Sequence, residues 1–275
     1  MTPVIEANIL VHTAMADSYN RNEPHYRPEN RAKVRSKLVS LKRPQFRRML
    51  DVGCGTGFII DLAKDLFDEV HGVDVTQAML DRVDRTGGNV TLYRCSAERL
   101  PFGGECFDFA TAYAFLHHLE DYRSVLREVH RVLRPGGHFY VDLEPNRAFW
   151  AAIDALERGS STGREPPDPI VTREIESVLY TDQRVEREFG LSAQVFNNAE
   201  YTKARLGGID AAQFCEDARM LGFRDCRVRY EWFLGQGAVM HGQSIEAAAT
   251  VEEYLRRALP LSAHLFKYLE FVLAK

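Results

Sequence analysis

The sequence has no run of about 18 consecutive apolar residues, the length that an α-helix needs to cross a bilayer. Residues 1–11 have neither a basic start nor a small-residue cleavage site, so they do not predict a signal peptide. Five scattered cysteines, an odd number, favour a reducing cytoplasm over a disulfide framework. No Cys/His group has the spacing of a zinc site. These absences predict a cytoplasmic protein with no membrane partner.

The composition that remains is ordinary for a globular protein, with 45% hydrophobic and 27% charged residues and a net charge of −4. Residues 31–48 depart from it, because they hold eight basic residues and no acidic one. Such a run could bind nucleic-acid phosphates. The alternative is an amphipathic helix with Lys33 and Lys37 toward solvent and Val34 and Leu38 inward. The overall acidity favours the helix, so a nucleic-acid partner is not expected.

A glycine-rich loop is the most informative motif. Residues 49–52 have the pattern of a buried strand, residues 53–57 read Gly-Cys-Gly-Thr-Gly, and residues 58–67 have apolar positions at helical spacing. A second short strand follows and ends at Asp74, 17 residues after the last glycine of the loop. An acidic residue near this distance binds ribose hydroxyls in dinucleotide-binding folds. The unit therefore predicts a site for an adenosyl ligand.

The spacing of this loop indicates which adenosyl ligand it suits. Its glycines alternate, unlike the G-x-G-x-x-G of pyrophosphate sites. Asp51 adds a carboxylate at the strand end, which would repel a pyrophosphate but attract an ammonium or a sulfonium. The sequence therefore favours a ligand with a cationic end over a dinucleotide.

Residues 49–145 resemble the core of a class I S-adenosylmethionine-dependent methyltransferase. Five stretches match this family in order and spacing: 50–57, 70–75, 94–102, 107–119 and 131–137. One departure is Ser96, where the family often has an aspartate beside the adenine. The resemblance implies S-adenosylmethionine as cofactor, S-adenosylhomocysteine as product, and a cofactor site made of Tyr19, Asp51, Gly53, Cys54, Gly55, Gly57, Asp74, Val75, Met79, Ser96, Ala97, Glu98, Ala112 and Tyr113.

The periodicity agrees with this fold. Strand patterns alternate with helical ones, as in a parallel sheet with crossover helices. The predicted strands are 49–52, 70–75, 90–94, 107–113 and 138–143, and the family adds an antiparallel pair at 226–233 and 268–273. The predicted fold class is α/β, a Rossmann-like methyltransferase fold with a seven-stranded mostly parallel sheet, helices on both faces, an N-terminal helical cap and helical insertions.

Four segments are predicted along the chain. They are an N-terminal helical cap (1–48), a cofactor-binding core (49–145), a helical lid insertion (146–208) and the remainder of the core (209–275), with a second insertion at 234–267. The lid has helical patterns at 149–156 and 172–189, separated by a stretch at 159–168 that predicts a mobile loop. A cap and two insertions would roof the site and exclude polymers, which favours a small-molecule acceptor.

His117 and His118 are the predicted catalytic residues, because they follow the fourth strand and imidazole titrates near neutrality. Glu144 is expected to face solvent. Asp142, Glu144 and Asn146 are oxygen donors, but their spacing does not resemble the metal-dependent catechol-methylating family, so no metal site is expected.

The predicted function is methyl transfer to an O or N atom of a small metabolite, in specialised metabolism. One alternative is an RNA or other nucleic-acid methyltransferase that uses residues 31–48, which retention of RNA with a steep salt dependence would reveal. A second is a protein that binds the cofactor without transferring methyl. The sequence leaves the oligomeric state open, with a homodimer among the alternatives.

Overall fold

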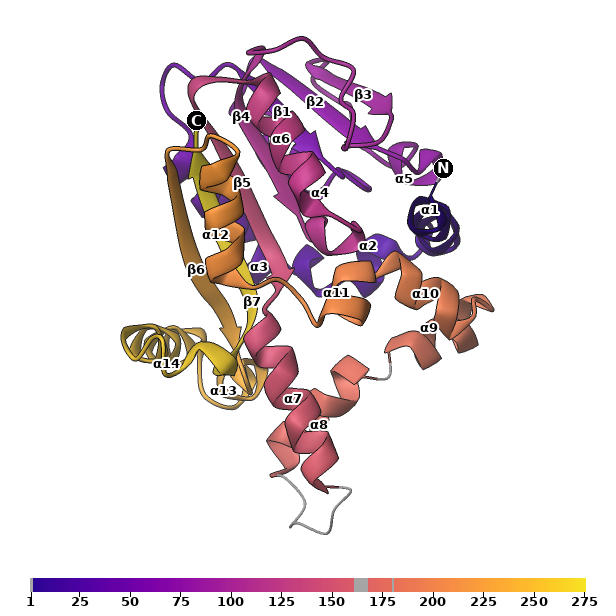
Figure 1. Ribbon diagram of the computed structural model, residues 1–275, viewed down its shortest axis with the longest axis vertical. Helices are drawn as coiled ribbons and strands as arrows, with labels where there is room; N and C mark the ends of the chain where they lie inside the picture. Colours follow the sequence, from indigo (N-terminus) through magenta and orange to yellow (C-terminus); the bar gives the residue numbers. More distant parts are fainter. Residues whose placement is uncertain (1, 161–167, 180) are drawn as a thin grey trace.

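A seven-stranded sheet forms the centre of the computed structural model, which describes residues 2–160, 168–179 and 181–275. The strand order is β3-β2-β1-β4-β5-β7-β6 (Figure 1). β7 pairs antiparallel with β5 and β6, and the other neighbouring pairs are parallel. The strands are β1 (Arg48–Val52), β2 (Glu69–Asp74), β3 (Val90–Arg94), β4 (Phe107–Tyr113), β5 (Leu133–Pro145), β6 (Asp225–Phe233) and β7 (Phe266–Ala274).

Helices connect these strands and add the cap and the insertions. The α-helices are α1 (Pro3–Met15), α2 (Tyr19–Asn22), α3 (Pro28–Leu41), α4 (Phe58–Ala63), α5 (Gln77–Leu80), α6 (Tyr122–Val132), α7 (Arg147–Ser160), α8 (Pro169–Leu179), α9 (Thr181–Phe189), α10 (Ala193–Ala199), α11 (Tyr201–Leu206), α12 (Ala211–Met220), α13 (Gln236–Gly242) and α14 (Ile245–Arg257). Three short 3₁₀ helices are η1 (Pro24–Tyr26), η2 (Leu116–His118) and η3 (Ala263–Leu265).

Helices cover both faces of the sheet, because the side chains of a strand alternate between the two sides. Leu50 and Val52 of β1 belong to an apolar core that includes residues of α6 and α12. Met49, the residue before Leu50, points to the opposite face and belongs to a second core with residues of α3 and α4. The predicted fold class is confirmed.

The N-terminal cap and the lid insertion meet above the carboxyl ends of the strands. Ala7 and Val11 of α1 pack against Phe196 and Ala199 of α10, and these four side chains are buried. Figure 1 shows α1, α10 and α9 side by side at one edge, while α7 and α8 project away from the sheet. Two segments far apart in the sequence thus build one roof.

The lid differs in detail from its prediction. The helical pattern at 172–189 corresponds to two helices, α8 and α9. Of the loop expected at 159–168, residues 159 and 160 end α7, and residues 161–167 lie outside the described part of the chain. In the ranges that the structure describes, no helix is long and apolar enough to cross a membrane.

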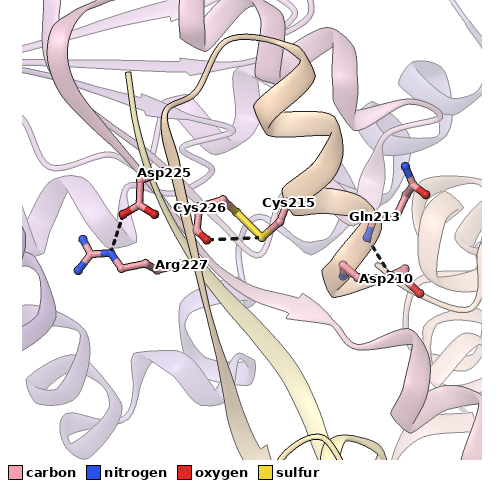
Figure 2. Close-up of a disulfide and its surroundings, with 7 residues drawn as sticks. Asp210, Gln213, Cys215, Asp225, Cys226 and Arg227 are labelled. Carbon is pink, nitrogen blue, oxygen red and sulfur yellow. Dashed lines mark hydrogen bonds and ion pairs between the residues drawn. A yellow bond between two sulfur atoms is a disulfide. The ribbon is translucent and has the colours of Figure 1, made fainter.

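The preference for unpaired cysteines is wrong at one place. Cys215 of α12 and Cys226 of β6 form a disulfide, with their Cα atoms 5.5 Å apart (Figure 2). Their separation of 11 residues gave no sign of this, because the pairing depends on the α12–β6 turn. Cys54, Cys95 and Cys106 are free.

The basic segment at residues 31–48 is occupied by ion pairs with the protein's own carboxylates. Lys33 and Lys37 do not simply face solvent, because they pair with the buried Glu231 and Glu270 of β6 and β7. Arginines 31, 35, 47 and 48 pair with acidic residues of α4, its flanking turn and β2. These pairs leave little positive charge to bind a phosphate backbone.

Candidate functional site

A cavity of about 960 Å³ lies at the carboxyl ends of β1, β2 and β4, beneath α1. Ligands of open α/β sheets bind at this edge. Most of the predicted site residues line it: Tyr19, Asp51, Gly53, Cys54, Gly55, Asp74, Val75, Met79, Ser96, Ala97, Glu98, Tyr113 and His118.

Three predicted residues lie outside this lining. Gly57 precedes α4, and a Cβ there would meet the Val83 side chain at 2.8 Å, so its role is packing. Ala112 is 1% exposed within the core. His117 faces a second cavity. The periodicity of the sequence alone did not distinguish residues that pack in the core from residues that line the cavity.

The loop between β1 and α4 needs glycine for steric reasons. Gly53, Gly55 and Gly57 have φ of 67°, 52° and 87°, in the left-handed region that favours glycine. A Cβ on Gly53 would lie 2.1 Å from the Phe115 ring, whereas one on Gly55 would meet nothing closer than Met79 at 3.9 Å. Gly53 therefore lets the loop approach the turn after β4. At Gly55 the absence of a side chain leaves space in the cavity.

Asp74 fixes the loop from the neighbouring strand. Its Oδ2 accepts a hydrogen bond from the Gly55 backbone N–H at 2.9 Å, and its Oδ1 accepts one from the Thr76 N–H at 2.8 Å. Each carboxylate oxygen has a further lone pair. Asp74 can thus hold the loop and still accept hydrogen bonds from a ribose.

Asp51 places a buried carboxyl group at the cavity. The residue is 1% exposed, and Thr111 donates a hydrogen bond to its Oδ1 at 2.6 Å. Its Oδ2 has no hydrogen-bond partner among the described residues. Burial raises the pKa of Asp51 to about 7, against the lowering effect of the Thr111 hydrogen bond. A cationic ligand would stabilise the ionised carboxylate, which fits the sulfonium and ammonium groups of S-adenosylmethionine.

The N-terminal cap is tied to this loop by side chains that the sequence did not single out together. Tyr26 donates to Thr56 Oγ1 at 2.5 Å, and Thr56 donates to Asn20 Oδ1 at 2.6 Å. Asn8 and His12 of α1 also line the cavity. Tyr26 lines the cavity as well, and α1 carries no motif from which Asn8 and His12 could have been chosen.

A second cavity, of about 1410 Å³, adjoins the first. Its walls come from α1, η1, the turn after β4, and the lid helices α7, α9 and α10. Both cavities share His12, Tyr19, His25, Ala114 and His118. Ala114 has φ of 51°, an unfavourable conformation for alanine that turns the chain directly after β4. The two cavities therefore meet where β4 ends.

Glu144 organises the turn between the cavities, and the expectation that it faces solvent is wrong. The side chain is 0% exposed. Its two oxygens accept hydrogen bonds from the backbone N–H groups of Phe115, Leu116 and His117 at 2.8–3.0 Å. Leu143 has φ of 60°, which breaks the alternation of β5 just before Glu144. The sequence pattern could not show this irregularity.

The two histidines differ in their surroundings. His117 donates its Nδ1–H to Glu144 Oε2 at 2.9 Å. Burial acts to lower the pKa of His117, but the carboxylates of Glu144 and Glu200 outweigh it and raise the pKa. Burial and the neighbouring His117 lower the pKa of His118 to about 3. His118 is therefore neutral near pH 7 and has one nitrogen lone pair for a proton or a metal ion.

Comparisons with known proteins agree with this geometry. Residues 50–141 match a family model described as a methyltransferase domain. Demethylmenaquinone methyltransferase from Geobacillus kaustophilus is 41% identical over 99 residues, which are 33% of this chain and 42% of the relative. Malonyl-[acyl-carrier protein] O-methyltransferase from Enterobacter lignolyticus is 29% identical over 150 residues, 51% of this chain and 60% of the relative.

Solved structures share the fold at low sequence identity. Haemonchus contortus phosphoethanolamine N-methyltransferase 2, in complex with phosphomonomethylethanolamine and S-adenosylhomocysteine, aligns with a TM-score of 0.54 at 19% identity, covering 95% of this chain and 56% of that one. A Mesorhizobium loti S-adenosylmethionine-dependent methyltransferase aligns with a TM-score of 0.53 at 19% identity, covering 93% and 100%.

Residues 50–141 thus match a methyltransferase domain, and the sheet has the fold of solved S-adenosylmethionine-dependent methyltransferases. The chain spans 42% and 60% of the length of these two curated relatives. The region that matches the family model ends at residue 141, before the lid, and does not include the N-terminal cap.

Proposed function

We propose that this protein transfers a methyl group from S-adenosylmethionine to an O or N atom of a small molecule held in the second cavity. The observation that carries this proposal is the junction of the two cavities at Ala114 and His118. One cavity has the features of a cofactor site and the other is roofed by the cap and the lid. The junction is where a methyl donor and an acceptor could meet.

The contribution of the protein is mainly to align the reactants. S-adenosylmethionine supplies a methyl group on a sulfonium sulfur, which leaves with the electron pair of the broken S–C bond. Positioning of two reactants can lower a barrier by about 7–11 kcal/mol. The turn that Glu144 holds sets the direction of the junction, and Asp51 and Asp74 anchor the opposite wall. His118 is the predicted catalytic residue that touches both cavities, whereas His117 positions it.

The second cavity suits an acceptor of mixed polarity. Aromatic rings of Tyr19, Trp150 and Phe196 line it together with the carboxylates of Glu23 and Glu200. Two of the relatives are named for methylating a demethylmenaquinone and a malonyl-[acyl-carrier protein], and a structural neighbour for methylating phosphoethanolamine. These acceptors have little in common, whereas methyl transfer is common to all three. This supports methyl transfer as the reaction and the cap and lid as the parts that select the acceptor. We propose further that the acceptor belongs to specialised metabolism and that the enzyme acts in the cytoplasm.

Isotopic transfer from labelled cofactor tests the proposal. The purified chain is incubated with methyl-deuterated S-adenosylmethionine and a fractionated metabolite extract, and products are followed by mass spectrometry. We expect a small molecule to gain the labelled methyl group and S-adenosylhomocysteine to accumulate. Asp74→Ala is the control, because it removes the anchor of the loop. Absence of transfer to any small molecule, or transfer to RNA added in parallel, would overturn the proposal.

A further inference from the structure

We propose that His117, His118 and Glu200 bind a divalent transition-metal ion at the wall of the second cavity. One ligand atom from each of these residues lies within 4.8 Å of the other two. His117 and His118 belong to η2, and Glu200 lies between α10 and α11. The inference goes beyond methyl transfer itself, because neither cofactor binding nor in-line displacement requires a metal.

The distances leave room for an ion between the three side chains. Glu200 Oε2 lies 3.8 Å from His117 Nε2, and Glu200 Oε1 lies 3.5 Å from His118 Nδ1. These separations are longer than charge-assisted hydrogen bonds of about 2.7–2.9 Å. They are close to the spacing of ligands that bind one ion at about 2.0–2.2 Å.

The imidazole of His117 is held as that of a metal-binding histidine usually is. A histidine ligand commonly donates its other ring N–H to a carboxylate or a backbone carbonyl, which fixes its tautomer. His117 donates Nδ1–H to Glu144 at 2.9 Å, so its Nε2 keeps the lone pair on the side of Glu200. His118 differs, because the nitrogen that faces Glu200 is Nδ1, which donates its hydrogen to the Ala199 carbonyl at 2.8 Å. Binding an ion through this nitrogen requires the other tautomer, with the proton on Nε2, and loss of the Ala199 hydrogen bond. Glu144 is in turn fixed by backbone N–H groups and cannot turn away.

The charges nearby favour a cation, with one competitor. Glu23 and Glu200 both line the cavity at this point. Lys203 lies on the other side, with its Nζ 3.6 Å from Glu200 Oε2 and 5.0 Å from the Trp150 ring. Its side chain is one-quarter exposed and can move toward solvent. Lys203 is thus the internal cation that a metal ion would displace.

The donor set indicates the type of metal. Two imidazoles and one carboxylate suit zinc, cobalt or iron rather than magnesium or calcium. Three protein ligands leave a coordination position open, as in catalytic sites. The cavity lies on that side, so an acceptor oxygen could complete the coordination and lose its proton more readily. The sequence did not predict the site, because Glu200 is 82 residues from His118 and joins it only when α10 packs on α1.

Cobalt binding to the chelator-treated full chain tests the proposal. We expect Co²⁺ to bind with one ion per chain and to give the visible absorption bands of a four- or five-coordinate site, which Zn²⁺ abolishes by displacement. Glu200→Gln and His118→Asn should each weaken binding by at least about 10-fold. Lys203→Gln should tighten it, because this variant removes the competing cation. His241→Asn, on an exposed helix, is the matched control for adventitious binding and should change nothing.

Two results would overturn the proposal. One is the absence of a stoichiometric cobalt spectrum, and the other is a spectrum that Glu200→Gln leaves unchanged although circular dichroism shows a folded variant. S-adenosylmethionine binding, measured on the same samples, separates this proposal from the proposed function. Cofactor binding without metal binding contradicts only the metal site, and metal binding without methyl transfer contradicts only the function.

Discussion

The cofactor cavity and the acceptor cavity share five residues, yet they are built in different ways. The first depends on backbone conformation at the ends of β1, β2 and β4, where glycine is required and Asp74 holds the loop. The second is enclosed by side chains of α1 and the lid, which come from opposite ends of the sequence. A substitution should therefore affect cofactor binding strongly in the first cavity and weakly in the second.

The largest expected effect comes from Gly53→Val. The new Cβ would overlap the Phe115 ring, and valine disfavours φ of 67°. Overpacking of about 1–3 kcal/mol and a backbone cost of about 1–2 kcal/mol predict binding of S-adenosylmethionine weaker by about 30- to 4000-fold in calorimetry. Gly103→Val is the control, since nothing lies within 4 Å of its Cβ position. Binding within about 3-fold of wild type would show that the loop need not keep this shape.

Asp51→Asn tests the electrostatic half of the same cavity without changing its shape. Loss of a charge-assisted contact of about 1.5–3 kcal/mol predicts S-adenosylmethionine binding weaker by about 10- to 100-fold. Asp225→Asn, exposed at the start of β6, should leave the affinity unchanged. A neutral adenosyl analogue that lacks the sulfonium and the ammonium should bind wild type and Asp51→Asn equally. If Asp51→Asn weakened binding of this analogue as much as binding of the cofactor, the loss could not be assigned to the charge of Asp51.

The pKa of Asp51, about 7, predicts opposite pH trends for binding and stability. Ionised Asp51 attracts the cationic cofactor, so its affinity should rise as pH increases through about 7, by up to about 10-fold. The raised pKa of this carboxyl stabilises the free protein at low pH, and that stability is lost as pH rises through the folded pKa. Titration calorimetry between about pH 6 and 8 measures the first trend. Thermal unfolding between about pH 4 and 8 measures the second, because the stability is lost between the ordinary pKa of an aspartate, 3.8, and the folded pKa of about 7. Both should disappear in Asp51→Asn, and their persistence there would assign them to another group.

The same contrast explains what the sequence could predict. Residues 50–57 and Asp74 are close in the chain, and their spacing reflects local backbone geometry, so fold and cofactor cavity were recognisable. Apolar runs and turn signals placed six of the strands to within two residues, whereas β5 begins at Leu133, five residues before its predicted start. The periodicity could not distinguish Gly57 and Ala112, which pack in the core, from residues that line the cavity.

The acceptor side was less predictable because it depends on long-range packing. Glu144 faces inward because Leu143 adopts a positive φ that no residue pattern announces. Glu200 reaches His117 through the packing of α10 on α1 and of α11 on η2. The disulfide of Cys215 and Cys226 likewise follows from the tertiary packing of α12 on β6.

The smallest effect on the cofactor is expected from Arg184→Gln, in the acceptor cavity. Arg184 lines that cavity and is exposed, so its replacement should change stability by less than about 0.5 kcal/mol. The affinity for S-adenosylmethionine should stay within about 2-fold of wild type, while KM for the identified acceptor changes by about 3- to 10-fold, because a rim contact is worth about 1 kcal/mol. Arg85→Gln, an exposed change away from both cavities, should alter neither quantity. Arg184→Gln could instead weaken cofactor binding as strongly as Asp51→Asn. The two cavities would then have to be treated as one continuous site, because the different origins of their walls would no longer predict separate effects.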